Sequence, residues 1–211
     1  MKKQVIITIG RQFGSRGKEI GQRLAERLGI ECYDRRLIVL ASRESGLCPE
    51  FFERADEKNT GSLLNAFATG CAFGGFYSPD FLSNEKLFQI QSDAIRKLAE
   101  RESCVLVGRC ADYILRDKER CVNIFIHAPV EIRVRTVMER QALARAEAME
   151  LVRKMDKTRA NYYNYYTDKE WGVASSYHLA LDSSLLGVAQ TVEFIALFLA
   201  GHEKREEKDP K

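Results

Sequence analysis

The chain has 211 residues, of which 45% are hydrophobic and 30% are charged, as expected for one globular domain of moderate size. This composition excludes collagen-like, low-complexity and wholly disordered proteins. The 33 lysines and arginines barely outnumber the 30 aspartates and glutamates, and the net charge is only +3. A nucleic-acid or acidic-membrane partner is therefore not expected from bulk charge, and an anion site must come from local placement of cations.

Two apolar stretches have the composition of targeting or membrane segments but not the length. The first, residues 4–9, is too short for the core of a signal peptide. The second, residues 185–200, is interrupted by Gln190, Thr191 and Glu193 and falls short of the roughly 20 apolar residues that span a bilayer. We expect a cytoplasmic protein with no membrane partner, in which residues 185–200 form an amphipathic helix.

The cysteines and histidines do not form a metal-binding pattern. The six cysteines are scattered without a C-x-x-C pair, so we expect reduced and mostly buried thiols. The three histidines have no cysteine or carboxylate at ligand spacing. These residues are Cys32, Cys48, Cys71, Cys104, Cys110, Cys121, His127, His178 and His202.

Strand and helix patterns alternate along the chain. Residues 4–9 form a β-branched apolar run, typical of a strand buried on both faces of a parallel sheet. A helix with apolar residues at every fourth position follows and stops at Gly29. Further helices are predicted around 87–98, 130–142 and 187–199, and further strands at 104–107, 122–126 and 178–181. This order indicates a layered α/β fold.

Three stretches do not fit the alternation. Residues 59–80 are rich in glycine and phenylalanine and are interpreted as a mobile cover within a segment spanning 45–85. Residues 147–172 combine a basic helix with tyrosines, a pattern often found in lids. Residues 203–211 are predicted to be a solvated, disordered tail. A single domain would then cover residues 1–202.

The sharpest motif is the glycine-rich stretch 10–20, between the first strand and the first helix. Such a loop turns backbone N–H groups inward and adds the positive end of a helix, which together cradle phosphate. Lys18 would place a charge on the terminal phosphates. The match to G-x-x-x-x-G-K-[ST] is incomplete, because Gln12 replaces the first glycine and Glu19 replaces the hydroxyl. The alternative is a plain tight turn with Lys18 in solvent.

The chain resembles the cytidylate kinase-like family of P-loop nucleotide kinases. The resemblance covers nearly the whole chain except 45–85 and rests on five motifs in the expected order. They are the stretches 7–20, 33–36 (Tyr-Asp-Arg-Arg), 105–109 (Val-Leu-Val-Gly-Arg), 155–163 and 179–183. The family implies a P-loop NTPase-type three-layer αβα sandwich with a central parallel sheet, a mobile acceptor-binding segment and a helical lid. It also implies ATP and Mg²⁺ as cofactors.

The resemblance implies a role for each matched residue. Gly14, Ser15, Arg16, Gly17, Lys18 and Glu19 would bind the phosphates of ATP. Asp34 and Arg109 would position an acceptor nucleoside monophosphate. Lys154, Asp156 and Arg159 match the lid pattern that closes over the transferring phosphoryl group and the acceptor. Lys18, Arg109 and Arg159 would stabilise the charge that develops during transfer.

Each of these roles has a structural alternative. Asp34 fits equally well as the cap of a helix that begins at Arg35. Lys154 and Arg159 lie in a highly charged helix and fit a solvated face. Arg109 follows Gly108 at the end of a strand, where ligands bind in α/β sheets. The tyrosines between 162 and 177 fit either packing, which we prefer, or a platform for single-stranded nucleic acid.

The family pattern breaks at three positions. Glu19 stands where the Mg²⁺-binding hydroxyl belongs, so the metal ligands stay undefined. Arg16 stands where the loop carries a small residue, and Cys110 where cytidylate kinases have an aspartate. Recognition of CMP itself is therefore unsupported. We expect an ATP-dependent kinase of a nucleoside monophosphate or a related small acceptor, present as a homodimer on base rates alone. The alternatives are a non-nucleotide acceptor and a silent nucleotide-binding regulator.

Overall fold

The computed structural model describes residues 4–34 and 84–208. The chain divides into two compact units, one formed by Met1–Cys32 with Glu102–Lys211 and the other by Tyr33–Arg101. The predicted cover at 59–80 and the helix that Asp34 would cap from Arg35 lie outside the described residues.

The first unit is built on a parallel β-sheet with strand order β2-β3-β1-β4-β5. The central strand β1 (Ile6–Arg11) pairs with β3 (Cys104–Val107) on one side and with β4 (Cys121–His127) on the other. Strand β2 (Glu31–Tyr33) lies at one edge, and β5 (Leu179–Asp182) pairs with β4 at the other. The buried apolar runs predicted near 4–9, 104–107, 122–126 and 178–181 are thereby confirmed as strands, with shifts of one or two residues.

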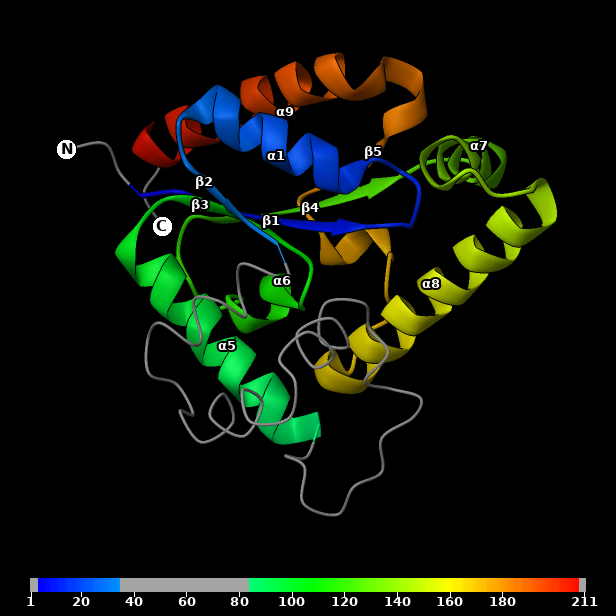
Figure 1. Ribbon diagram of the computed structural model, residues 1–211. Helices are drawn as coiled ribbons and strands as arrows, with labels where there is room; N and C mark the ends of the chain where they lie inside the picture. The colour runs from blue at the N-terminus through cyan, green and yellow to red at the C-terminus, as the bar shows by residue number, and fades with distance from the viewer. Residues whose placement is uncertain (1–3, 35–83, 209–211) are drawn as a thin grey trace, which may run out of the picture. The chain divides into compact units, whose positions relative to one another are not determined.

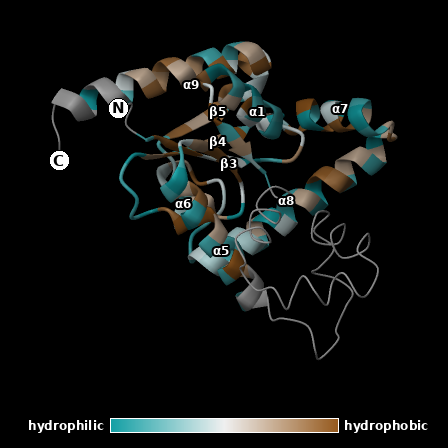
Figure 2. Cartoon of the chain, turned by 60° about the vertical axis from the view of Figure 1, so that its left-hand side comes forward, coloured by the Kyte–Doolittle hydropathy of each residue, from teal (hydrophilic) through white to brown (hydrophobic). Residues whose placement is uncertain are grey.

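Helices cover both faces of this sheet (Figure 1). Helices α1 (Gly17–Leu28) and α9 (Ser183–Lys208) lie on one face, and the short α6 (Ala111–Ile114) lies on the other. The main core joins Ile7, Ile9 and Ile124 of the strands to Ile20 of α1 and Ile195 of α9, all fully buried. Figure 2 shows hydrophobic colours on the strands and hydrophilic segments on the helices. The chain therefore has the expected layered α/β fold.

Helix α1 ends where the sequence predicts. Gly29 caps it in the left-handed conformation with φ of 67°, and its N–H bonds to the carbonyl of Glu26. A residue with a Cβ is strained in that conformation, which explains the stop at glycine.

Helix α9 differs from the prediction at both ends. It begins at Ser183, with one non-helical residue at Gly187, and continues to Lys208. The tail expected from residue 203 is therefore helical up to 208, because Glu, Lys and Arg are good helix formers and can extend an anchored helix. Residues 209–211 lie outside the described part.

Helix α9 also contains the one segment of the described chain, Ser183–His202, that is long and apolar enough to cross a membrane. Its residues Val188, Val192, Ile195 and Leu199 belong to the core beneath α1. One side of α9 therefore packs against the sheet and α1, while Leu185, Leu186, Phe194 and Leu197 are exposed.

Helices α7 (Val130–Gln141) and α8 (Arg145–Thr167) pack on one another beside the sheet. Val134 and Val137 of α7 meet Ala148 and Val152 of α8 in a second, smaller core. The phosphate-loop residue Phe13 packs against this cluster. The basic helix predicted within residues 147–172 is confirmed as α8.

The second unit contributes one described helix, α5 (Asn84–Arg101), as the apolar periodicity around 87–98 predicts. It buries Ala94, Ile95, Leu98 and Ala99 along one side. Arg101 at its end donates a hydrogen bond to the hydroxyl of Tyr33 at 3.1 Å.

Candidate active site

The glycine-rich loop leads from β1 into α1 and has the shape of an anion cradle. Gly14 and Arg16 both adopt left-handed conformations, with φ of 81° and 59°. The first helical hydrogen bond runs from the N–H of Ile20 to the carbonyl of Arg16. The N–H groups of Gly17, Lys18 and Glu19 therefore precede the helical ladder, in the position where helix N-termini bind phosphate.

Hydrogen bonds inside the loop hold this shape. The buried hydroxyl of Ser15 donates to the carbonyl of Gln12 at 2.9 Å and accepts a bond from the N–H of Gly17 at 3.4 Å. The carbonyl of Ser15 accepts a bond from the Ser183 hydroxyl at 2.8 Å, at the start of α9. The side-chain amide oxygen of Gln12 accepts a bond from the N–H of Ala128 after β4. The loop, which continues β1, is thus tied to the residues that follow the carboxyl ends of β4 and β5.

The charged residues at the start of α1 have different environments. Lys18 and Arg16 are exposed, and Arg16 lies 3.9 Å from Glu139. Glu19 accepts a hydrogen bond from Arg140 at 2.8 Å and lies 3.2 Å from Arg23. Its carboxylate is therefore already neutralised by two arginines, which makes it a weak candidate for holding Mg²⁺.

Arg109 lies in an unusual turn after β3. Gly108, Arg109 and Cys110 all have positive φ, of 80°, 62° and 55°. Consecutive left-handed residues are strained, and such strain gathers at functional sites. The N–H of Gly108 bonds to the carbonyl of Ile9, so the turn lies beside β1 and the loop that follows it. The Arg109 guanidinium lies 5.2 Å from the ring centre of Tyr162 on α8.

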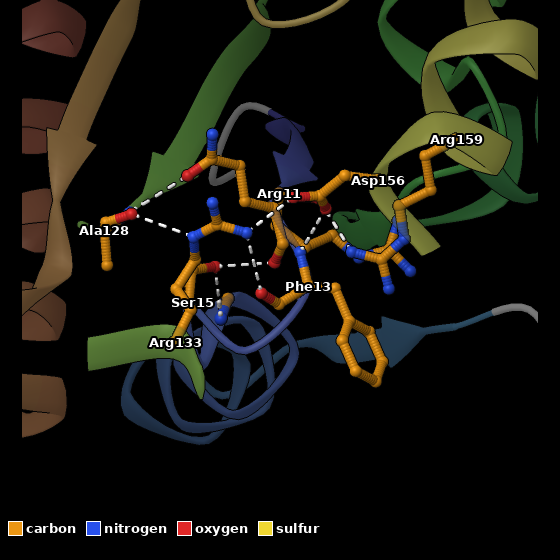
Figure 3. A network of polar contacts seen from close by, with 9 residues as sticks. Arg11, Phe13, Ser15, Ala128, Arg133, Asp156 and Arg159 are labelled. Carbon is orange, nitrogen blue, oxygen red and sulfur yellow. Dashed lines mark hydrogen bonds and ion pairs between the residues drawn. The ribbon is translucent and has the colours of Figure 1, made fainter. Parts of the chain in front are cut away.

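Asp156 on α8 is held behind the phosphate loop, as Figure 3 shows. One carboxylate oxygen accepts a hydrogen bond from the N–H of Phe13 at 2.7 Å, and the other contacts Arg133 at 2.5 Å. Arg133, on α7, is nearly fully buried and also donates to the carbonyls of Phe13 and Ala128. Helices α7 and α8 are thus both bonded to the loop at Phe13, through the ion pair of Arg133 and Asp156.

Arg159, one turn further along α8, lies against the same loop. Its guanidinium donates to the carbonyl of Arg11 at 2.9 Å and lies 5.3 Å from the centre of the Phe13 ring. Burial lowers the pKa of Arg159 to about 10, Asp156 opposes this shift, and Arg109 and Arg133 add to it. Lys18 and Arg109, predicted to act with Arg159, lie on the loop's helix and on the turn beside β1.

Lys154 and Asp34 are the other residues predicted to hold the acceptor. Lys154 is exposed on α8, and its backbone carbonyl accepts a hydrogen bond from the Thr158 hydroxyl at 2.8 Å. Asp34 belongs to the second unit.

Sequence reasoning missed Arg133, which bridges the loop and α8. A signal for it existed, because Arg133 interrupts the apolar side of α7 between Val130, Val134 and Val137. A charged residue at a buried helix position needs a partner. The sequence alone could not name Asp156 as that partner.

A second buried polar cluster joins α6 to the far end of α8. The hydroxyl of Tyr163 donates to Asp112 at 2.7 Å. Burial raises the pKa of Asp112, and the bond from Tyr163 opposes this shift. Burial also raises the pKa of Tyr177, whose ring packs on Phe125 at 4.9 Å between centres. Phe125 packs edge-to-face on Trp171. These contacts support the packing interpretation of the aromatic stretch.

The residues present fit a nucleotide better than a protein-bound metal. Within residues 4–34 and 84–208, no three His, Cys, Asp or Glu side chains group closely enough to hold a metal ion. The described cysteines, Cys32, Cys104, Cys110 and Cys121, form no disulfide with one another. The loop, in contrast, combines left-handed glycine geometry with a helix N-terminus and nearby arginines. This donor set suits phosphate oxygens.

The family follows from comparison with known proteins. The model of the cytidylate kinase-like family matches residues 6–185. The chain belongs to the cytidylate kinase-like family. This match takes in the phosphate loop, the turn at Arg109, helix α8 and strand β5. No curated protein matches the chain.

Solved structures agree on the fold. An uncharacterised protein from Eubacterium ventriosum ATCC 27560 is 27% identical, with a TM-score of 0.70 over 93% of this chain and 99% of that one. A gluconokinase from Sinorhizobium meliloti 1021 is 13% identical, with a TM-score of 0.57 over 99% and 100% of the two chains. A shikimate kinase from Acinetobacter baumannii, in complex with shikimate, is 16% identical, with a TM-score of 0.51 over 95% and 96%. The last two show the P-loop kinase fold alone.

Proposed function

We propose that this protein transfers the terminal phosphoryl group of ATP to a nucleoside monophosphate or a closely related small acceptor. The observation that carries the proposal is the arrangement of Arg109 and Arg159 around the loop that ends β1. Phosphoryl transfer needs positioning and positive charge around the equatorial oxygens rather than covalent help. Membership of a kinase-like family supports the same reaction class.

Each residue has a defined task in this proposal. The backbone of residues 14–19 binds the donor phosphates, with Lys18 at the terminal phosphates. Arg109 and Arg159 stabilise the charge that develops on the transferring group. Arg109 also positions the acceptor, together with Asp34 and Lys154, while Asp156 acts from behind the loop as a positioning residue.

ATP and Mg²⁺ are the cofactors that this reaction implies. When bound, Mg²⁺ would neutralise part of the charge on the donor phosphates. Because Glu19 is paired with Arg140 and Arg23, we do not assign it to the metal.

The test is ADP production from Mg·ATP across a panel of nucleoside monophosphates, with Lys18→Ala as the comparison. We expect turnover with one acceptor and its loss in Lys18→Ala, at an unchanged melting temperature. Full activity in Lys18→Ala would contradict the assignment of the loop.

A second candidate is a kinase with a non-nucleotide acceptor. It is favoured by Cys110, a buried thiol whose pKa is raised by burial and which stands where cytidylate kinases carry an acceptor-binding aspartate. Proteins of the same fold are described as a shikimate kinase and a gluconokinase. Adding shikimate and gluconate to the panel separates the two candidates, because each predicts turnover with its own acceptor class.

A third candidate is a regulatory protein that binds ATP without turnover. It is favoured by the ion pairs that occupy Glu19 at the position of the usual hydroxyl. Tight Mg·ATP binding with no ADP formed from any acceptor would favour it.

We propose a cytoplasmic protein that acts as a homodimer on small molecules. Binding of single-stranded nucleic acid is not favoured, because Tyr163 and Tyr177 are buried in packing contacts and the net charge is small. An oligonucleotide titration at low and high salt tests this, since a true site would lose affinity steeply with salt.

A further inference from the structure

Arg11, the last residue of β1, is held at the mouth of the phosphate loop. Its backbone is paired with Ile126 of β4, and its carbonyl accepts the hydrogen bond from Arg159 at 2.9 Å. The residue is half-buried. Its backbone is therefore fixed on both sides, while its side chain leaves the sheet where the carboxyl ends of β1 and β3 meet.

Two glycines mark the path of the Arg11 side chain. A Cβ on Gly17, the first residue of α1, would lie 2.5 Å from Cβ and 3.1 Å from Cγ of Arg11. A Cβ on Gly108, after β3, would collide with Nη1 of Arg11 and would lie 3.0 Å from its Cζ. The side chain thus starts against the N-terminus of α1 and ends over the turn that carries Arg109.

This path has a chemical consequence. The N-terminus of α1 is where the donor phosphates belong, and the turn at Arg109 is assigned to the acceptor. A guanidinium between them presents a planar fork of N–H donors to phosphate oxygens from both sides. Lys18, the cation that the sequence motif singles out, is exposed one position after Gly17.

We propose that Arg11 is a catalytic residue whose guanidinium binds the phosphoryl group as it passes from donor to acceptor. The proposal rests on the proposed phosphoryl transfer and adds a cation to Lys18, Arg109 and Arg159. Nearby arginines repel one another, and a bound phosphate relieves that repulsion. The lowered pKa of Arg159, to which Arg109 contributes, agrees with such a cation-rich setting.

The experiment compares Arg11→Gln with Gly108→Ala. The new methyl group at 108 must push the Arg11 guanidinium out of its position, although Arg11 itself is not mutated. Affinities for Mg·ATP and Mg·ADP are measured by calorimetry, together with turnover and the melting temperature without ligand. Because charge-assisted hydrogen bonds are strong, we expect Arg11→Gln to lose roughly tenfold to a hundredfold in affinity for Mg·ATP, and less for Mg·ADP. Gly108→Ala should likewise lose the preference for Mg·ATP over Mg·ADP. Arg11→Lys, which keeps the charge, should retain part of this preference.

Two matched controls distinguish the loss of the Arg11 contact from other effects. One tests backbone strain at a positive φ, and the other tests the loss of an arginine's charge. Gly29→Ala also places an alanine at positive φ, 67°, but with nothing within 4 Å. Arg27→Gln removes an arginine from the last turn of α1, where it pairs with Glu193 at 2.9 Å. Both controls should keep the preference for Mg·ATP over Mg·ADP.

The possible outcomes are distinct. A preference and turnover within twofold of wild type in Arg11→Gln would overturn the role of Arg11 while leaving the proposed function intact. A wild type that binds Mg·ATP without turnover would overturn the proposed kinase function, and the affinity ratio would still decide whether Arg11 contacts the terminal phosphate. A wild type that binds neither nucleotide would overturn both.

Discussion

The carboxylate of Asp156 accepts a hydrogen bond from the backbone N–H of Phe13 at 2.7 Å, across 143 positions of sequence. A residue of α8 therefore supports the glycine-rich loop directly. Its other oxygen pairs with the buried Arg133, so one carboxylate ties α8 to both α7 and the loop. The position of α8 is therefore coupled to the backbone of the loop at Phe13.

Replacing Asp156 with asparagine should destabilise the protein. The change leaves the Arg133 guanidinium buried without its counter-charge, and breaking such a pair costs on the order of 3 kcal/mol. Urea unfolding of Asp156→Asn measures this loss. The control is Glu131→Gln, which removes an exposed ion pair with Arg145 and should change stability by less than about 1 kcal/mol. Equal effects of the two changes would contradict a buried, structural pair.

Arg159 should matter more for transfer than for stability. Its guanidinium holds the carbonyl of Arg11 and lies among the cations of the site. Removing one preorganised donor to a developing charge slows catalysis by about a hundredfold to a thousandfold, so Arg159→Gln should lose kcat to that extent. Arg159→Lys should recover part of it by keeping the charge. Steady-state kinetics with the acceptor found in the panel test this, and an unaltered kcat in Arg159→Gln would remove Arg159 from the mechanism.

Gly14→Ala should distort the phosphate loop. A Cβ there would lie 2.6 Å from the backbone oxygen of Arg133, and the residue has a φ of 81°. Neither the neighbouring backbone nor the left-handed conformation accommodates alanine easily. We expect Mg·ATP binding to weaken well beyond the effect of Gly29→Ala, which carries similar backbone strain in open space. Calorimetric titration of both variants checks this, and equal affinities would show that the loop tolerates the side chain.

Asp112 should give the protein a distinct pH dependence of stability. Burial raises its pKa above the ordinary 3.8, so the folded state binds this proton more tightly than the unfolded chain does. The resulting stabilisation is complete below 3.8 and is lost as the pH rises through the raised folded value. Relative to Asp112→Asn, the wild type should therefore lose free energy of unfolding with rising pH. Denaturant unfolding of both proteins from below pH 3.8 upward tests whether the free energy of unfolding falls in this way. Asp117→Asn controls for the loss of an exposed carboxylate.

Local patterns predicted most of the fold. The apolar runs of β1, β3 and β4 and the four-residue spacing of α1 depend on burial and helix geometry, both of which a sequence displays. The extension of α9 to Lys208 was missed, because charged residues read as a solvated tail can also continue a helix that the core anchors. Charge alone does not separate these two outcomes.

The site was harder to predict because its geometry depends on contacts distant in sequence. The glycine-rich motif identified Lys18, and the family resemblance identified Arg159. Arg133 belongs to neither the motif nor the stretches that carry the resemblance. The Arg11 side chain has room only because Gly17 and Gly108 lack a Cβ. Only the folded backbone brings these two glycines next to it. The support that Asp156 gives to Phe13 likewise requires α8 to be docked on α7.

The central claim is phosphoryl transfer at this loop, and label transfer tests it most directly. Mg·ATP carrying a radioactive terminal phosphate is incubated with each acceptor of the panel, and the products are separated. We expect label on one acceptor, with equimolar ADP, and none with Lys18→Ala. Tight ATP binding with no labelled acceptor would contradict the kinase account and favour a regulatory role.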